Sequence, residues 1–258
     1  MHISPSSPFG PRIIPWTRFV LSAALVALAF RVSAREPLTA ALFGAFFVLS
    51  TIPAYLARRR ASRVLRSGDI RSVLSVWARN IARLPYPETM GPLVTAAAFA
   101  SCGWVDQART ALDRSVRGPA WEAALEHRLF VETLLDAFEG ERDAALSKAL
   151  QLGSLPVPTI GFFAAGRVRS LRGALAAFAR AFAHTSTPAD LTLLERESKK
   201  SPLMYWAMRY AAAVVAIDHG EHERARRMLG TAPPWPEGSA FNAFHQELSG
   251  ILDLRAEA

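Results

Sequence analysis

The feature that most constrains this chain is an uncharged run of 21 residues, from position 37 to position 57. A helix of about 20 apolar residues is long enough to cross the hydrocarbon layer of a membrane. Tyr55 falls where an interfacial aromatic is expected, and Arg58, Arg59 and Arg60 end the run. The run therefore predicts a membrane-spanning helix. The alternative is an all-apolar helix buried in the core of a globular domain.

A second apolar segment precedes this run, at residues 13–34. Its uninterrupted part, residues 19–30, is only 12 residues long, which is too short to cross a membrane alone. Trp16 extends the apolar segment on its N-terminal side, and the long side chain of Arg18 can reach the lipid headgroups. We therefore expect two membrane helices in a hairpin; an interfacial helix followed by one span is the alternative. The expected parts are a disordered tail over 1–12 and the hairpin over 13–60, with helices at about 13–34 and 37–57.

The positive charge of the chain is concentrated around this hairpin. Residues 1–66 hold nine Arg and one acid, Glu36, which accounts for the whole net charge of +8. Basic residues flank the cytoplasmic ends of membrane helices, so the Arg cluster after position 57 places both the N-terminus and the C-terminal domain in the cytoplasm. We expect the inner membrane of a bacterium. Because the rest of the chain is neutral, nucleic acid is not an expected partner.

Residues 67–258 show the periodicity of amphipathic helices and almost no strand-like alternation. A turn glycine followed five residues later by alanine occurs three times. The pairs are Gly103 and Ala108, Gly140 and Ala145, and Gly220 and Ala225. The glycines are 37 and 80 residues apart, which matches about one and two periods of a repeat made of two helices. The pattern predicts an all-α cytoplasmic domain over 67–258, built from stacked helical hairpins.

These units resemble tetratricopeptide repeats, most closely at residues 89–120. That unit has Ala96 in its first helix, the glycine–alanine spacing at its turn and Pro119 after the pair, but Val105 stands where the repeat has Tyr. The resemblance covers 89–151 and 200–236; a generic stack of helical hairpins is the alternative.

The resemblance implies an α-solenoid whose first helices line a concave surface that binds a protein or peptide. It further implies that Met90, Leu93 and Ala97 face that groove. A terminal helix, Phe241 to Leu254, is expected to cap the array.

No motif in the chain indicates catalysis or metal binding. A Walker-type phosphate loop, GxSxG, HExxH and CxxC are all missing from the sequence. Cys102 lies beside a turn glycine and is expected to be a small packed residue. We therefore expect no enzyme, no cofactor and no metal.

Together these observations predict a membrane-anchored scaffold for protein–protein interactions, whose partners are a protein or peptide and the lipid bilayer. Two alternatives stay open. One is a membrane-surface or lipid-binding module that acts through the basic amphipathic helix at 167–182. The other is a membrane enzyme without a recognisable motif.

Overall fold

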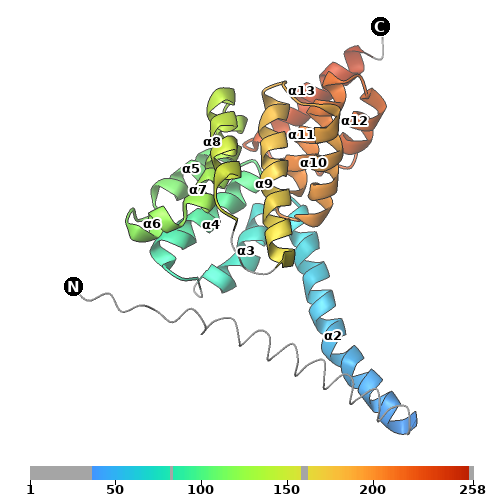
Figure 1. Ribbon diagram of the computed structural model, residues 1–258. Coiled ribbons are helices and arrows are strands. Elements are labelled where there is room, and N and C mark those ends of the chain that lie inside the picture. The colour runs from blue at the N-terminus through green and yellow to red at the C-terminus, as the bar shows by residue number, and fades with distance from the viewer. Residues whose placement is uncertain (1–36, 82–83, 158–161, 256–258) are drawn as a thin grey trace, which may run out of the picture. The chain divides into compact units, whose positions relative to one another are not determined.

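The computed structural model describes residues 37–81, 84–157 and 162–255, and within these ranges the secondary structure is helical throughout, without strands (Figure 1). The all-α prediction is confirmed. The expected tail over 1–12 and the first expected membrane helix over 13–34 lie outside the described residues. Trp16 and Arg18 lie outside them for the same reason.

The chain divides into two compact units, residues 1–60 and residues 61–258. In the first unit the structure describes helix α2 (Pro37–Arg66), which contains Pro53 and ends in the second unit. Tyr55 is 62 % exposed and Arg59 and Arg60 are exposed, whereas the side chain of Arg58 is outside the described part. None of the described helices combines the length and apolarity needed to cross a membrane; they include α2, which contains the predicted span over 37–57.

The second unit consists of helices joined by turns and loops. They are α3 (Ile70–Ile81), α4 (Pro87–Ser101), α5 (Val105–Asp113), α6 (Pro119–Ala123), α7 (Leu125–Phe138), α8 (Arg142–Ser154), α9 (Phe162–Phe182), α10 (Pro188–Lys200), α11 (Tyr205–Asp218), α12 (His222–Leu229) and α13 (Ala240–Leu254). Helices α4 and α5, α7 and α8, α9 and α10, and α11 and α12 pack as consecutive pairs. The first helices of successive pairs also contact one another, α4 with α7, α7 with α9 and α9 with α11.

The turns inside these pairs require a left-handed backbone. Gly103, Gly140 and Gly220 have φ angles of +77°, +84° and +78°, a conformation that glycine adopts without steric cost. The three predicted turn positions are thereby confirmed. The turn between α9 and α10 is made instead by His184, with φ +54°. His184 accounts for the long interval between Gly140 and Gly220.

Small residues let the second helix of each pair lie close to the first. Ala108, Ala145 and Ala225 are each the fourth residue of their helix and are at most 1 % exposed. Helix α10 has Leu191 at the same place, also 1 % exposed. The turn before α10 is two residues longer than the other turns, so the expected five-residue spacing from the turn does not apply there.

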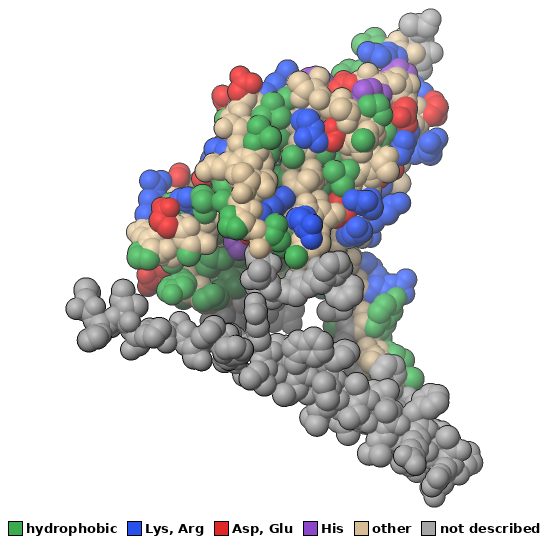
Figure 2. Space-filling view, in the orientation of Figure 1, with side chains coloured by type: hydrophobic (Ala, Val, Ile, Leu, Met, Phe, Trp, Pro, Cys, Tyr) green, Lys and Arg blue, Asp and Glu red, His purple; other side chains and the backbone are tan. Residues whose placement is uncertain are grey.

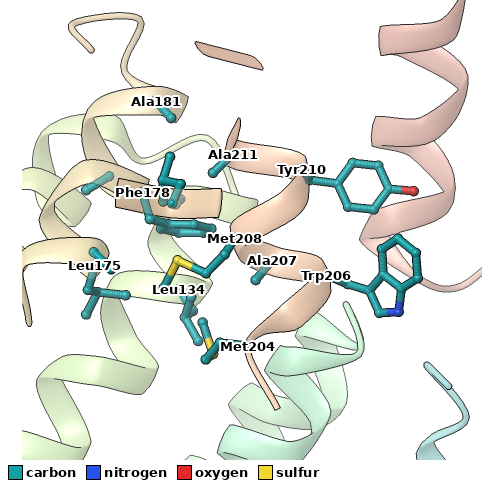
Figure 3. Close-up of a cluster of buried hydrophobic side chains, with 14 of the residues drawn as sticks. Leu134, Leu175, Phe178, Ala181, Met204, Trp206, Ala207, Met208, Tyr210 and Ala211 are labelled. Carbon is teal, nitrogen blue, oxygen red and sulfur yellow. The ribbon is translucent and has the colours of Figure 1, made fainter. Parts of the chain in front are cut away.

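The core lies between α7, α9 and α11. Phe178 of α9 and Met208 of α11 lie close together in this core (Figure 3), and both are fully buried. Trp206 and Tyr210 extend from the opposite side of α11. That side of α11 contacts α13.

Helix α13 contacts the first helix pairs as well as the last pair, α11 and α12. Phe241 in its first turn is fully buried, and its ring lies 5.5 Å from that of Phe138 in α7. The backbone N–H of Ala240 donates to the carbonyl of Gly103 at 2.8 Å, and the hydroxyl of Ser239 donates to the carbonyl of Cys102 at 2.9 Å. The C-terminal helix therefore closes onto the turn of the first pair as well as the last one.

The last turn of α2 belongs to this unit. The indole N–H of Trp206 donates to the carbonyl of Arg66 at 2.7 Å, and the guanidinium of Arg66 donates to the carbonyl of Lys199 at 2.7 Å. The same guanidinium lies 4.8 Å from the centre of the Tyr205 ring. These contacts fix the end of α2 to α10 and α11.

Candidate functional site

The sequence-predicted groove residues lie mostly inside the domain. Leu93 is 1 % exposed and belongs to the core, so it cannot contact a partner without repacking. Met90 and Ala97 are half-buried and pack against the same core. The expectation that the three residues face a common groove fails at Leu93, because that face of α4 packs against neighbouring helices. For Met90 and Ala97 it stays a prediction.

A different hollow, of about 180 Å³, opens where the ends of α7, α9 and α11 meet α13. We call it the C-terminal groove. Its floor is aromatic and comes from three helices: Phe138 of α7, Phe182 of α9 and Phe244 of α13. The ring of Phe182 lies 6.0 Å from that of Phe138 and 5.2 Å from that of Phe244. All three rings are half-buried, so they leave apolar surface open to a ligand.

The rim of the C-terminal groove is charged. Arg142 and Glu247 are exposed, and neither forms an ion pair with another described residue. Across the groove, Nδ1 of His184 lies 3.0 Å from the carboxylate of Asp218. The groove therefore presents an apolar floor between charges of both signs.

His184 makes the rim unusual, because it holds a left-handed conformation without being glycine. That conformation costs about 1–2 kcal/mol for a residue with a Cβ. Strained residues concentrate at functional sites, where surrounding contacts hold them in place. Here the contact with Asp218 helps to hold the imidazole at the edge of the groove.

A catalytic site can depend on metal ligands or on a reactive cysteine. No group of three or more His, Cys, Asp and Glu side chains among the described residues could hold a metal ion. Burial raises the pKa of the Cys102 thiol to about 12, and the residue is 2 % exposed. Cys102 is thus a packed residue, and its thiol is protonated at neutral pH.

Helix α9 presents fewer free cations than its sequence suggests. Arg172 is 5 % exposed and donates to the carbonyl of Leu155 at 2.6 Å and to the carboxylate of Glu126 at 3.1 Å. Arg180 pairs with Asp190. Only Arg167 and Arg169 remain exposed on this stretch, which weakens the case for 167–182 as a lipid-binding surface.

Sequence reasoning missed the C-terminal groove because its residues come from five helices, α7, α8, α9, α11 and α13. The phenylalanines of the groove have the sequence spacing of ordinary core residues, so the sequence does not distinguish them as part of a binding site. The one local sign was positional: His184 lies between Gly140 and Gly220, where a repeat of about 40 residues requires a turn.

Comparisons of the chain with protein-family models, curated proteins and solved structures found no match.

Proposed function

We propose that this chain is an interaction protein: an α-solenoid of tetratricopeptide-like hairpins, attached to a membrane, that binds an apolar segment of a partner protein in the C-terminal groove. The observation that carries the proposal is the open aromatic floor formed by Phe138, Phe182 and Phe244. Half-buried rings at the bottom of a hollow are surface that a ligand can cover with a gain in free energy.

The chemistry of the groove defines the partner segment. An aromatic or long aliphatic side chain fits the floor, and burying one such side chain contributes about 1.5–3 kcal/mol. Residues beside this anchor would meet Arg142 and Glu247 at the rim, which favours a segment with both an acidic and a basic flank. A short anchored segment of this kind is typical of transient partners.

The membrane part of the proposal rests on the sequence alone. Residues 37–57 carry no charge, and basic residues follow immediately. On this proposal the second unit, residues 61–258, is held at the cytoplasmic face of the inner membrane. Extraction of cell membranes with alkaline carbonate tests this part: full-length protein should stay in the pellet, and its release would refute the attachment.

The groove part is tested by exchanging the charges at its rim. The full-length double variant Arg142→Glu/Glu247→Arg keeps the net charge and changes only exposed residues. The matched control is Arg71→Glu/Glu237→Arg, which exchanges two exposed charges outside the groove. We expect the rim variant to lose at least one co-purifying protein that the control retains. Identical recovery by wild type and both variants would contradict binding at the groove.

A further inference from the structure

A second hollow of about 250 Å³, between α10, α11 and α12, is lined mainly by cations. We call it the basic pocket. Four basic side chains line it together with a single carboxylate, that of Glu195; the four are Lys199, Arg209, Arg224 and Arg227. On the face drawn in Figure 2, Lys and Arg side chains gather around α10 and α12. The residues that line the basic pocket thus carry a net charge of +3, which the pairing of Arg224 with Glu221 beside the pocket reduces to +2.

Only one of the four cations is neutralised by a carboxylate. The guanidinium of Arg224 holds both oxygens of Glu195, at 2.8 and 2.7 Å, and also pairs with Glu221 at 2.8 Å. Lys199, Arg209 and Arg227 form no ion pair with any described residue. Like charges repel one another, so three cations without a carboxylate partner around one hollow favour an anion as its ligand.

Arg209 contributes a positive charge that the fold holds in place. Its guanidinium donates to the Tyr205 hydroxyl at 3.0 Å and to the carbonyl of Met228 at 2.6 Å. It also lies 5.7 Å from the centre of the Trp206 ring. Because neutral groups make all these contacts, its charge remains available, and little conformational entropy is lost when a ligand arrives.

Lys199 and Arg227 supply the free donors. Both side chains are exposed at the mouth of the pocket, and neither makes a side-chain hydrogen bond to another described residue. The pKa of the Glu195 carboxyl is lowered. The hydrogen bond from Arg224 and the positive charges of Arg224, Lys199 and Arg209 lower it, and together they outweigh burial, which raises it. Glu195 is therefore ionised at neutral pH and fixes Arg224 at the wall of the pocket.

We propose that the basic pocket binds a phosphate group. An ammonium and a guanidinium with free donors, backed by a fixed third cation, match the charge and the several acceptor oxygens of phosphate. The phosphate group can belong to a lipid headgroup or to a free phosphorylated compound. This inference is independent of the C-terminal groove and of the membrane attachment.

Titration of the full-length protein in a non-ionic detergent tests the proposal, at constant ionic strength. The probes are pyrophosphate, dihexanoyl phosphatidylglycerol below its micellar concentration, and dihexanoyl phosphatidylcholine as the zwitterionic comparison. The pocket variant is Lys199→Gln/Arg227→Gln, and the control variant is Arg71→Gln/Arg114→Gln, which removes two exposed charges elsewhere. All of these side chains are exposed, so folding is expected to be preserved, and circular dichroism checks this.

We expect saturable binding of at least one anionic probe, weakened about tenfold or more in the pocket variant and less than about twofold in the control. Binding of phosphatidylglycerol alone identifies a lipid headgroup as the source, whereas binding of pyrophosphate identifies a free phosphorylated ligand. The proposal is overturned if neither anionic probe binds, or if both variants weaken binding equally.

Discussion

The rings of Tyr210 and Phe241 stack face to face, with centroids 5.1 Å apart and an angle of 8° between their planes. Tyr210 belongs to α11 and Phe241 to the first turn of α13. Both side chains are at most 1 % exposed, so the contact is part of the core. It follows that α13 is an integral part of the second unit, residues 61–258, and that the floor of the C-terminal groove depends on it.

Replacement of Phe241 by alanine should destabilise the domain strongly. The ring is fully buried against Phe138, Tyr210 and Trp235, and losing such a ring costs about 3–5 kcal/mol. Urea denaturation measures the change. Leu254→Ala is the control at the far end of α13, where the side chain is 71 % exposed; it should change the free energy of unfolding by less than about 0.5 kcal/mol. Equal effects would show that α13 is not docked.

Replacing Gly140 and replacing Gly250 by alanine should change the stability of the protein in opposite directions. Gly140 has φ +84° and no atom within 4 Å of an added Cβ, so Gly140→Ala meets only backbone strain, of about 1–2 kcal/mol. Gly250 lies inside α13, also with open space around it, so Gly250→Ala should stabilise by about 0.5–1 kcal/mol. Thermal unfolding of the two variants measures both effects. Destabilisation of the same size in both would refute the left-handed turn at Gly140.

Asp190 should make the stability depend on acid pH. Burial raises the pKa of its carboxyl, but the hydrogen bonds from Arg180 and from the backbone of Thr187 more than offset this, so the pKa is lowered. A carboxyl whose pKa is lower in the folded than in the unfolded chain stabilises the fold at pH values above its unfolded pKa of about 3.9. This contribution is lost as the pH falls through the folded pKa.

The variant Asp190→Asn lacks this charge. Urea denaturation between pH 7 and pH 3 should therefore show a stability difference from wild type that is largest at the neutral end and shrinks below about pH 4. A difference that does not change with pH would contradict an ionised, paired Asp190.

Cys102 should resist alkylation while the protein is folded. Its thiol is buried, and burial raises its pKa to about 12, so almost no thiolate exists at pH 8. Iodoacetamide should modify it only after addition of guanidinium chloride, as followed by intact mass. Modification of the folded protein at the rate of the unfolded chain would contradict this environment.

Local signals in the sequence predicted three of the turns between paired helices correctly. Glycines at 103, 140 and 220 stand where the backbone is left-handed, and that requirement acts within a few residues. The helix pairs around them follow from the same spacing. The turn at His184 was not predicted, because histidine adopts a left-handed conformation far less often than glycine and therefore gives no comparable signal in the sequence.

The position of binding surfaces could not be predicted from local patterns. Leu93 has the place of a groove residue in the repeat that the chain resembles, yet packing buries it. The C-terminal groove depends on where α13 docks, and that is decided by contacts such as the one between Phe138 and Phe241, which are about 100 residues apart in sequence. The same holds for the basic pocket, whose cations come from three helices.

The most direct test of the central claim is site-specific photo-cross-linking in cells. A photoreactive amino acid replaces Glu247 at the rim of the C-terminal groove in one full-length variant, and exposed Leu150 on α8 in another. We predict a discrete adduct to a partner protein from position 247, lost when Arg142→Glu is added, and no such adduct from position 150. The absence of an adduct at 247, or the same adducts at both positions, would contradict the groove as the partner-binding surface.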